Sequence, residues 1–419
     1  MTLKRLWNNP GRILDFLFVP VACVLIWLRL LDTFGILNPN LILAALVLIY
    51  GIRHAVQERS IGCRFSIGWI GAALLLVLIT EWLVYLFSSY KPNSFYALVE
   101  TLGVFFFYYL IKISAGEKPA AFFVGMTIVG ILHSLGALLR FIPVWLKLRA
   151  LGFEDMTYFK DLLLYGDWVV NALLLLPYPV ILVFMFRNQI RKAVFPAVAV
   201  FIVSAPILLS FSRGAYIAGA FFLVLADIAF LKYRLLRAKT LVFCNAAILA
   251  VIVPASLPFI ASVHSTTAMV RTVSQTRSAD SRREIWAESL KLVRENPVTG
   301  VGSYNFALRF MAIAPYDETK GVIRTPQNTA IGIAVEKGLI GIAAYVLLLA
   351  AIVGTGFARL AKTKDCFDRA IIISILSAVA ATAVYLTTYY ASLGNQGTAF
   401  LAAAFMASLD GMKLKELAL

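Results

Sequence analysis

One arginine in the sequence stands inside an apolar segment, "PILLSFSRGAYIAG" at residues 206–219. A charged side chain beside hydrocarbon costs a few kcal/mol or more, so Arg213 needs an anionic or aqueous partner there. The guanidinium group donates two parallel hydrogen bonds to an oxyanion and stays charged when partly desolvated. More arginines follow within residues 261–328: Arg271, Arg277, Arg282, Arg283 and Arg324. These residues predict an oxyanion ligand at a membrane surface, and a diphosphate is one ligand that would fit this arrangement.

The composition predicts what kind of elements position these arginines. Of 419 residues, 61% are hydrophobic and 14% are charged, and the mean hydropathy is +0.85. Soluble globular domains do not reach such values. Apolar runs of roughly 20 residues, enough to cross a bilayer, indicate an all-α integral membrane protein with about 12 transmembrane helices. The spans are expected near 13–31, 36–51, 67–88, 95–115, 119–141, 166–187, 193–211, 214–231, 240–260, 329–356, 370–390 and 396–412.

A single long loop interrupts this pattern. Residues 1–260 are expected to hold transmembrane helices 1–9, residues 261–328 the loop, and residues 329–419 helices 10–12. A loop of this length is usually functional or disordered, and this one is expected to be ordered because its segment "SADSRREIWAESLKLVRENP" predicts an amphipathic helix. Asp280 or Ser281 is the expected N-cap, and Asn296 and Pro297 end the helix. The apolar positions at helical spacing are Ile285, Trp286, Leu290 and Val293. Glycines in the following "VTGVGSYNF" indicate a tight turn.

Lysine and arginine predict the orientation in the membrane. About 21 lysines and arginines fall in segments on the same side of the membrane as the N-terminus. Roughly seven fall in the short loops on the other side. Both termini are therefore expected in the cytoplasm, with residues 261–328 and Arg213 outside. Positive cytoplasmic loops account for most of the net charge of +16, so no nucleic-acid partner is expected. Four scattered cysteines and three histidines show no metal-ligand spacing, and neither a metal nor a cofactor is expected.

Three motifs in order around the long loop resemble the bacterial O-antigen ligase and polymerase family. They are "SFSRGAY", "SRREIWAESLKLVRENPVTGVGSYNF" and "TPQNTAIGIAVEKGLIG". In that family a span ends in S-R-G, the outer loop carries R-x-x-x-W and N-P-x-x-G-x-G, and the next span begins with H-N and E-x-G-x-x-G. The resemblance implies a multi-pass protein of the bacterial inner membrane whose active site is on the periplasmic face.

The resemblance also implies the reaction and the partners. Such enzymes take a glycan from an undecaprenyl diphosphate carrier and attach it to a sugar hydroxyl, on lipid A-core in a ligase or on another carrier-linked glycan in a polymerase. The ligase is the expectation here. The leaving group is an alkyl diphosphate, so arginines can neutralise its developing charge without a metal.

Carried over residue by residue, the resemblance makes Arg213 and Arg282 the candidate diphosphate ligands. Arg283 is a weaker candidate, since it points about 100° away around the helix. Other candidates for substrate binding are Arg324, Asn328 and Tyr304.

Gln327 departs from the family, which commonly has a histidine before the asparagine. Glutamine cannot act as a base near neutral pH, although it can orient a hydroxyl. Three explanations stay open: a base elsewhere, with Glu336, Asp317 or Glu318 as candidates; catalysis by leaving-group stabilisation alone; or a weakly active enzyme.

Alternative interpretations accompany these expectations. A transporter or lipid flippase fits about twelve spans equally well, but it would carry its ionisable groups near mid-membrane. Arg213 could lie at a helix end and reach lipid headgroups, and Arg282 could pair with Glu284 or Glu288. Other polar residues have structural interpretations: Gln327 and Asn328 as helix caps, Tyr304 as a packing residue, Glu81 and His133 as groups satisfied within the bundle, and Gly338 and Gly341 as sites of close helix packing.

Overall fold

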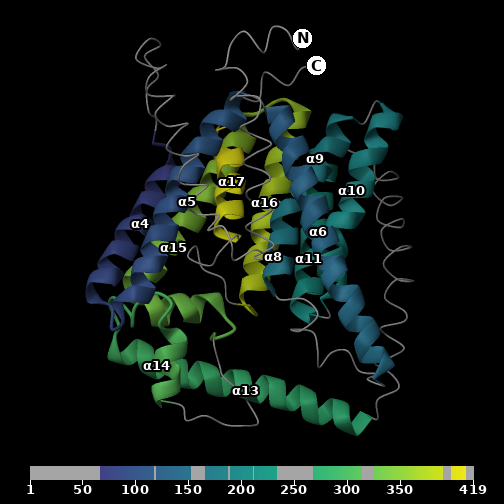
Figure 1. Ribbon diagram of the computed structural model, residues 1–419. Helices are drawn as coiled ribbons and strands as arrows, with labels where there is room; N and C mark the ends of the chain where they lie inside the picture. Colours follow the sequence, from purple (N-terminus) through teal and green to yellow (C-terminus); the bar gives the residue numbers. More distant parts are fainter. Residues whose placement is uncertain are drawn as a thin grey trace, which may run out of the picture.

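The computed structural model describes residues 67–117, 119–151, 166–186, 189–210, 212–233, 268–313, 325–389 and 398–411. Every regular element within these ranges is an α-helix, as the sequence predicts (Figure 1). The helices are α4 (Trp69–Phe87), α5 (Lys91–Glu117), α6 (Pro119–Ala150), α8 (Gly166–Leu175), α9 (Pro177–Met185), α10 (Ile190–Leu209), α11 (Arg213–Lys232), α13 (Ala268–Glu295), α14 (Phe306–Ile313), α15 (Thr329–Lys362), α16 (Cys366–Leu386) and α17 (Thr398–Gly411).

Seven described segments are long and apolar enough to cross a membrane, which confirms a helical membrane protein. They are α4, α6, the pair α8 and α9, α10, α11, α15 and α16. The predicted spans near 13–31, 36–51 and 240–260 lie outside the described residues, and the others fall on described helices. The predicted span 166–187 is interrupted at Leu176, because Pro177 has no N–H to continue the first helix.

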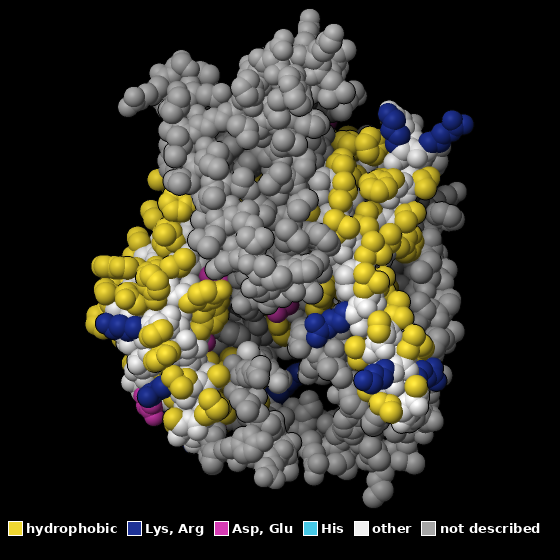
Figure 2. Space-filling model, in the orientation of Figure 1, with side chains coloured by type: hydrophobic (Ala, Val, Ile, Leu, Met, Phe, Trp, Pro, Cys, Tyr) yellow, Lys and Arg dark blue, Asp and Glu magenta, His cyan; other side chains and the backbone are white. Residues whose placement is uncertain are grey.

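The spans pack as a bundle around a core of aromatic and aliphatic side chains. The closest neighbours are α5 and α17, α11 and α16, and α4 with both α15 and α5. Among the largest fully buried side chains are Phe107, Tyr108, Phe122, Phe123 and Tyr178. The outside is also apolar: Trp69 is 82% exposed and Leu139 is 75% exposed. Figure 2 shows such side chains on both flanks, and on the right flank they lie between Lys and Arg side chains near the two ends, as a surrounding bilayer requires.

Helix α13 crosses one end of the bundle, where it contacts both α14 and α15 (Figure 1). It packs through Ile285 and Leu292 onto Val335 of α15 and onto Phe306 and Phe310 of α14. Leu292, seven residues after Ile285, is buried, whereas Leu290, predicted to share this face, is 47% exposed.

The predicted N-cap of this helix is wrong, since α13 begins at Ala268 and runs through both Asp280 and Ser281. The reason is that the preceding "AMVRTVSQTRSA" holds neither proline nor glycine to stop it. The predicted end is confirmed, because α13 ends at Glu295, directly before Asn296 and Pro297.

Candidate active site

The loop 296–305, "NPVTGVGSYN", docks into a break in helix α15. Gly338 has φ +62° and ψ −158°, which divides α15 into two helical parts and leaves backbone groups without helical partners. The loop supplies those partners, so two motifs that are separate in sequence form one structure. Four backbone hydrogen bonds join them: Val301 N–H to Val335 O (2.9 Å), Gly302 N–H to Glu336 O (3.0 Å), Leu339 N–H to Pro297 O (2.9 Å) and Ile340 N–H to Val298 O (3.3 Å).

This close approach requires glycine on both sides. Gly300 has φ +67°, and a Cβ there would overlap the backbone of Glu336 and Lys337. A Cβ on Gly338 would overlap the carbonyl group of Val298. Positive φ is also a conformation that favours glycine. The tight turn predicted from the loop glycines is therefore confirmed, while Gly338 serves a helix break and not only helix packing.

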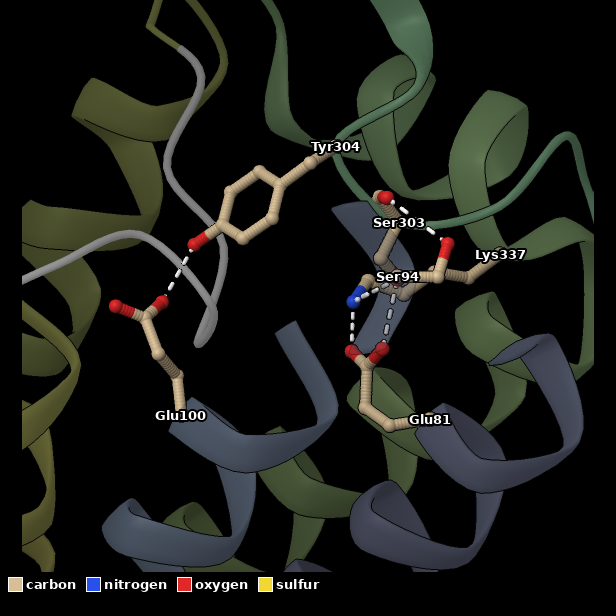
Figure 3. A network of polar contacts seen from close by, with 6 residues as sticks. All are labelled: Glu81, Ser94, Glu100, Ser303, Tyr304 and Lys337. Atoms are coloured by element: carbon tan, nitrogen blue, oxygen red, sulfur yellow. Dashed lines mark hydrogen bonds and ion pairs between the residues drawn. The ribbon is translucent and has the colours of Figure 1, made fainter. Parts of the chain in front are cut away.

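A buried ion pair lies directly beneath the loop (Figure 3). The Lys337 ammonium group pairs with the Glu81 carboxylate of α4, and both side chains are at most 1% exposed. The Ser303 hydroxyl donates to Glu81 Oε2 at 2.7 Å and accepts from Lys337 Nζ at 3.1 Å. The prediction that Glu81 is satisfied within the bundle is thus confirmed. Two helices and the loop are connected through this one cluster.

The same loop is held by the turn between α4 and α5. Asn305 donates through Nδ2 to Ser88 Oγ (2.9 Å) and to the carbonyl oxygen of Tyr90 (3.2 Å). Tyr304, with φ +61°, donates its hydroxyl to Glu100 Oε2 at 2.7 Å. Burial and the Glu100 carboxylate raise the pKa of Tyr304, so the phenol stays protonated. These contacts support the packing interpretation of Tyr304.

A second cluster forms where α13 meets the segment 325–328 that leads into α15. Arg282 Nε donates to Gln327 Oε1 at 2.9 Å. One turn further along α13, Trp286 Nε1 donates to the carbonyl oxygen of Pro326 at 2.9 Å. Residues four apart lie on one helix face, so the arginine and tryptophan of the R-x-x-x-W motif hold this segment together. Glu288, one of the two expected alternative partners of Arg282, pairs with Lys291 at 2.7 Å.

The end of α16 brings the start of α15 to the start of α11. Asn328 caps α15 by accepting from Ile331 N–H at 3.0 Å, and its Nδ2 donates to the carbonyl oxygen of Thr387 at 2.9 Å. Gly214, the residue after Arg213, lies so close to Thr388 that a Cβ would overlap the threonine hydroxyl. Residues 212–214, 282–286, 326–329 and 387–389 therefore meet at one end of the bundle, and we call this region the candidate site.

The candidate site gathers some predicted residues and separates others. Arg282 contacts Gln327 directly, and the next residue, Asn328, contacts the end of α16. Arg213 is the first residue of α11, which begins beside the same end of α16. Arg283 is exposed on α13, whereas Glu336 is 2% exposed and accepts from Phe306 N–H at 3.4 Å. Outside the described residues lie Arg324, Asp317, Glu318 and the side chain of Arg213.

This arrangement favours an anion. Two helix N-termini contact the end of α16 at the candidate site: α11, capped by Ser212, and α15, capped by Asn328. The partial positive charge of a helix N-terminus attracts oxyanions, and the nearby Arg282 adds a full charge and a planar set of donors. The geometry suits a phosphate or diphosphate group better than a neutral sugar alone.

Lys337 and Glu100 are not among the residues predicted from the sequence. Lys337 stands in an apolar span, and an ionisable residue in a span signals a partner in another helix. Glu81 is likewise an ionisable residue in an apolar span, so its opposite charge makes it a possible partner for Lys337. Glu100 carried a similar signal within α5.

Fold and site together define a polytopic helical membrane protein that collects arginine-bearing segments at one end of its bundle. A family model described as O-antigen ligase matches residues 197–346, which include all three motifs. The match confirms the resemblance to the bacterial O-antigen ligase and polymerase family. A comparison with curated proteins finds no match.

Proposed function

We propose that this protein is an O-antigen ligase-type glycosyltransferase. It transfers a glycan from undecaprenyl diphosphate to a sugar hydroxyl of lipid A-core, at the periplasmic face of the inner membrane. The observation that carries the proposal is the convergence of the three motifs at the candidate site, with Arg282 bonded to Gln327 beside the first turns of α11 and α15. The family match over the same residues supports it.

The chemistry needs little from the protein beyond charge and position. The acceptor hydroxyl oxygen attacks the anomeric carbon, the bond from that carbon to the diphosphate oxygen breaks, and undecaprenyl diphosphate leaves with the electron pair. Arg213 and Arg282 neutralise the charge that develops on the diphosphate. Positioned arginines can replace a metal ion in this role, which is why we propose a metal-independent reaction.

The acceptor proton must pass to a base. Glu336 is eight residues after Asn328, so it lies roughly 12 Å further along α15. Its burial and its contact with Phe306 suit a structural role in the docked loop. Of the carboxylates considered from the sequence, we therefore propose Asp317 or Glu318 as the proton acceptor.

A transporter is less well supported. Glu81 and His133, two of the ionisable residues within the spans, are each 1% exposed. Glu81 is paired with Lys337, and His133 stacks on Trp168 with ring centroids 4.4 Å apart. A charge that is paired and a ring that is stacked in this way suit bundle stability better than alternating exposure to two sides.

A null strain tests the proposed function through its surface glycans. Loss of long glycan from lipid A-core, with long glycan retained on the carrier, is the expected result for a ligase. Core carrying a single repeat would instead identify a polymerase of the same family. Loss of long glycan from the core, with lipid-linked glycan retained on the cytoplasmic side of the membrane, would favour the transporter.

Topology gives a separate prediction. A reporter fused at Thr299 is expected outside and one at Leu419 inside, because the lysine and arginine asymmetry places the long loop in the periplasm. Gln189 offers a matched internal control at the start of α10, roughly 30 Å along that helix from the candidate site. Paired alkaline phosphatase and fluorescent protein fusions report the side. Equal sidedness at Thr299 and Leu419 would contradict the topology.

A further inference from the structure

We propose that Gln327 is a diphosphate-binding residue that also positions Arg282, and that it does not stand in for a base. This inference rests on the proposed function and concerns the same site. It explains how a glutamine can serve at a position where a histidine was expected from the family resemblance.

The hydrogen bond between the two side chains fixes the orientation of the amide. A guanidinium group can only donate, so the atom that faces Arg282 Nε must be the amide oxygen of Gln327. The amide nitrogen then faces away from Arg282 and offers two N–H donors. Arginine has five N–H donors and this bond uses one of them, so the pair as a whole presents donors to whatever lies beside it.

The backbone around Gln327 is fixed from both sides. Pro326 accepts from Trp286 of α13, and Asn328 caps α15 while donating to Thr387 of α16. Gln327 itself has φ +53°, a left-handed conformation that residues other than glycine adopt only where surrounding contacts impose it. The side chain is therefore presented by a fixed segment although it is exposed.

An anionic oxygen is the partner that these donors favour. An acceptor hydroxyl that received a hydrogen bond from the amide would have a lone pair engaged and would be a weaker nucleophile. A diphosphate oxygen gains from each donor, and the N-terminus of α15 and the Arg282 charge lie beside it. A single face made of Arg282, Gln327 and the first turn of α15 can thus bind the leaving group.

Substitutions at this position separate a donor from a base. Gln327→Glu keeps an acceptor for Arg282 but adds a negative charge, so the KM for the lipid-linked donor should rise roughly 10- to 100-fold. Gln327→Leu removes the donors and should raise this KM by a comparable factor. The KM of Gln327→His should stay within a few-fold of the wild-type value. Neutral imidazole can accept from Arg282 with one ring nitrogen and donate to the diphosphate with the other.

The test uses purified full-length protein in detergent, a lipid-linked glycan donor and a core acceptor, with rates measured from pH 6 to pH 9. Undecaprenyl diphosphate alone serves as a binding probe, and it should raise the melting temperature of wild type more than that of Gln327→Glu. Gln189→Glu is the control, because it adds the same charge at the end of α10 that is remote from the candidate site. It should leave the KM and the melting shift unchanged.

Two results would overturn the inference. A rise in turnover for Gln327→His or Gln327→Glu by orders of magnitude, with an inflection near the pKa of the new group, would show a base position in a weakened enzyme. An unchanged KM and melting shift for Gln327→Leu would show that the amide binds no diphosphate. Failure of the wild type to transfer any glycan would count against the proposed function itself, while the melting shift would still report on binding.

Discussion

Replacing either Arg213 or Arg282 with alanine is expected to lower glycan transfer by roughly two orders of magnitude. The physical reason is the loss of the proposed interaction with the departing diphosphate, worth about 3 kcal/mol in the transition state. Arg213→Lys should also lose most of the activity, because lysine is a point charge without the bidentate geometry of arginine. Initial rates with purified protein, donor and acceptor, measured in the presence of a chelator, give the comparison.

Arg294 is the matched control for this prediction, since it is an exposed arginine near the end of the same helix α13. Arg294→Ala should transfer at the wild-type rate and show the same yield in the membrane. Near-normal transfer by Arg213→Ala would return that residue to the alternative in which it only reaches lipid headgroups. Near-normal transfer by Arg282→Ala would limit Arg282 to holding the segment 325–328.

The second large effect is expected at the buried ion pair. Lys337→Met or Glu81→Leu should destabilise the fold by about 3–5 kcal/mol, because each leaves the opposite charge buried and unpaired. The combined variant Glu81→Leu, Lys337→Met and Ser303→Ala removes both charges and the bridging hydroxyl. Its stability should be close to that of the wild type, since apolar replacement of a whole buried pair is often neutral. Thermal unfolding in detergent and the yield of inserted protein are the measurements.

An exposed ion pair on α13 provides the comparison. Lys291 pairs with Glu288 at 2.7 Å, with 60% of the lysine side chain exposed, so Lys291→Met should change stability by about 0–1 kcal/mol. Single variants of the buried pair that unfold at the wild-type temperature would show that the pair does not hold the loop to α4. A triple variant as unstable as the single ones would show that the charges themselves are needed.

Hydropathy predicted much of the bundle but not the break in α15. The apolar run predicted at residues 329–356 continues straight past Gly338, and only the distant loop 296–305 gives that glycine its role. A window average cannot show such a break, because the partners of the freed backbone groups lie outside the window. The start of α13 was missed for a related reason: a polar cap residue does not end a helix that continues before it.

The candidate site was partly predictable because its three motifs are local patterns. Arg282 and Gln327 were each identified, but their separation of 45 positions in the sequence concealed their hydrogen bond. The end of α16 carries no motif, and yet Thr387 and Thr388 connect α15 to α11. Glu81 and Lys337 lie 256 residues apart, so no spacing rule could pair them. What the sequence did not show in each case is a contact between segments that the fold brings together.

The docking of residues 296–302 against residues 335–340 also bears on how chimeric proteins of this kind can be made. The four hydrogen bonds across this contact run from backbone to backbone, and the glycines that permit them lie on both partners. A loop transplanted from a relative would meet a foreign helix break, and a transplanted helix would lose the donors and acceptors that complete it. The two segments thus form one exchangeable unit, and a boundary for recombination belongs outside both of them.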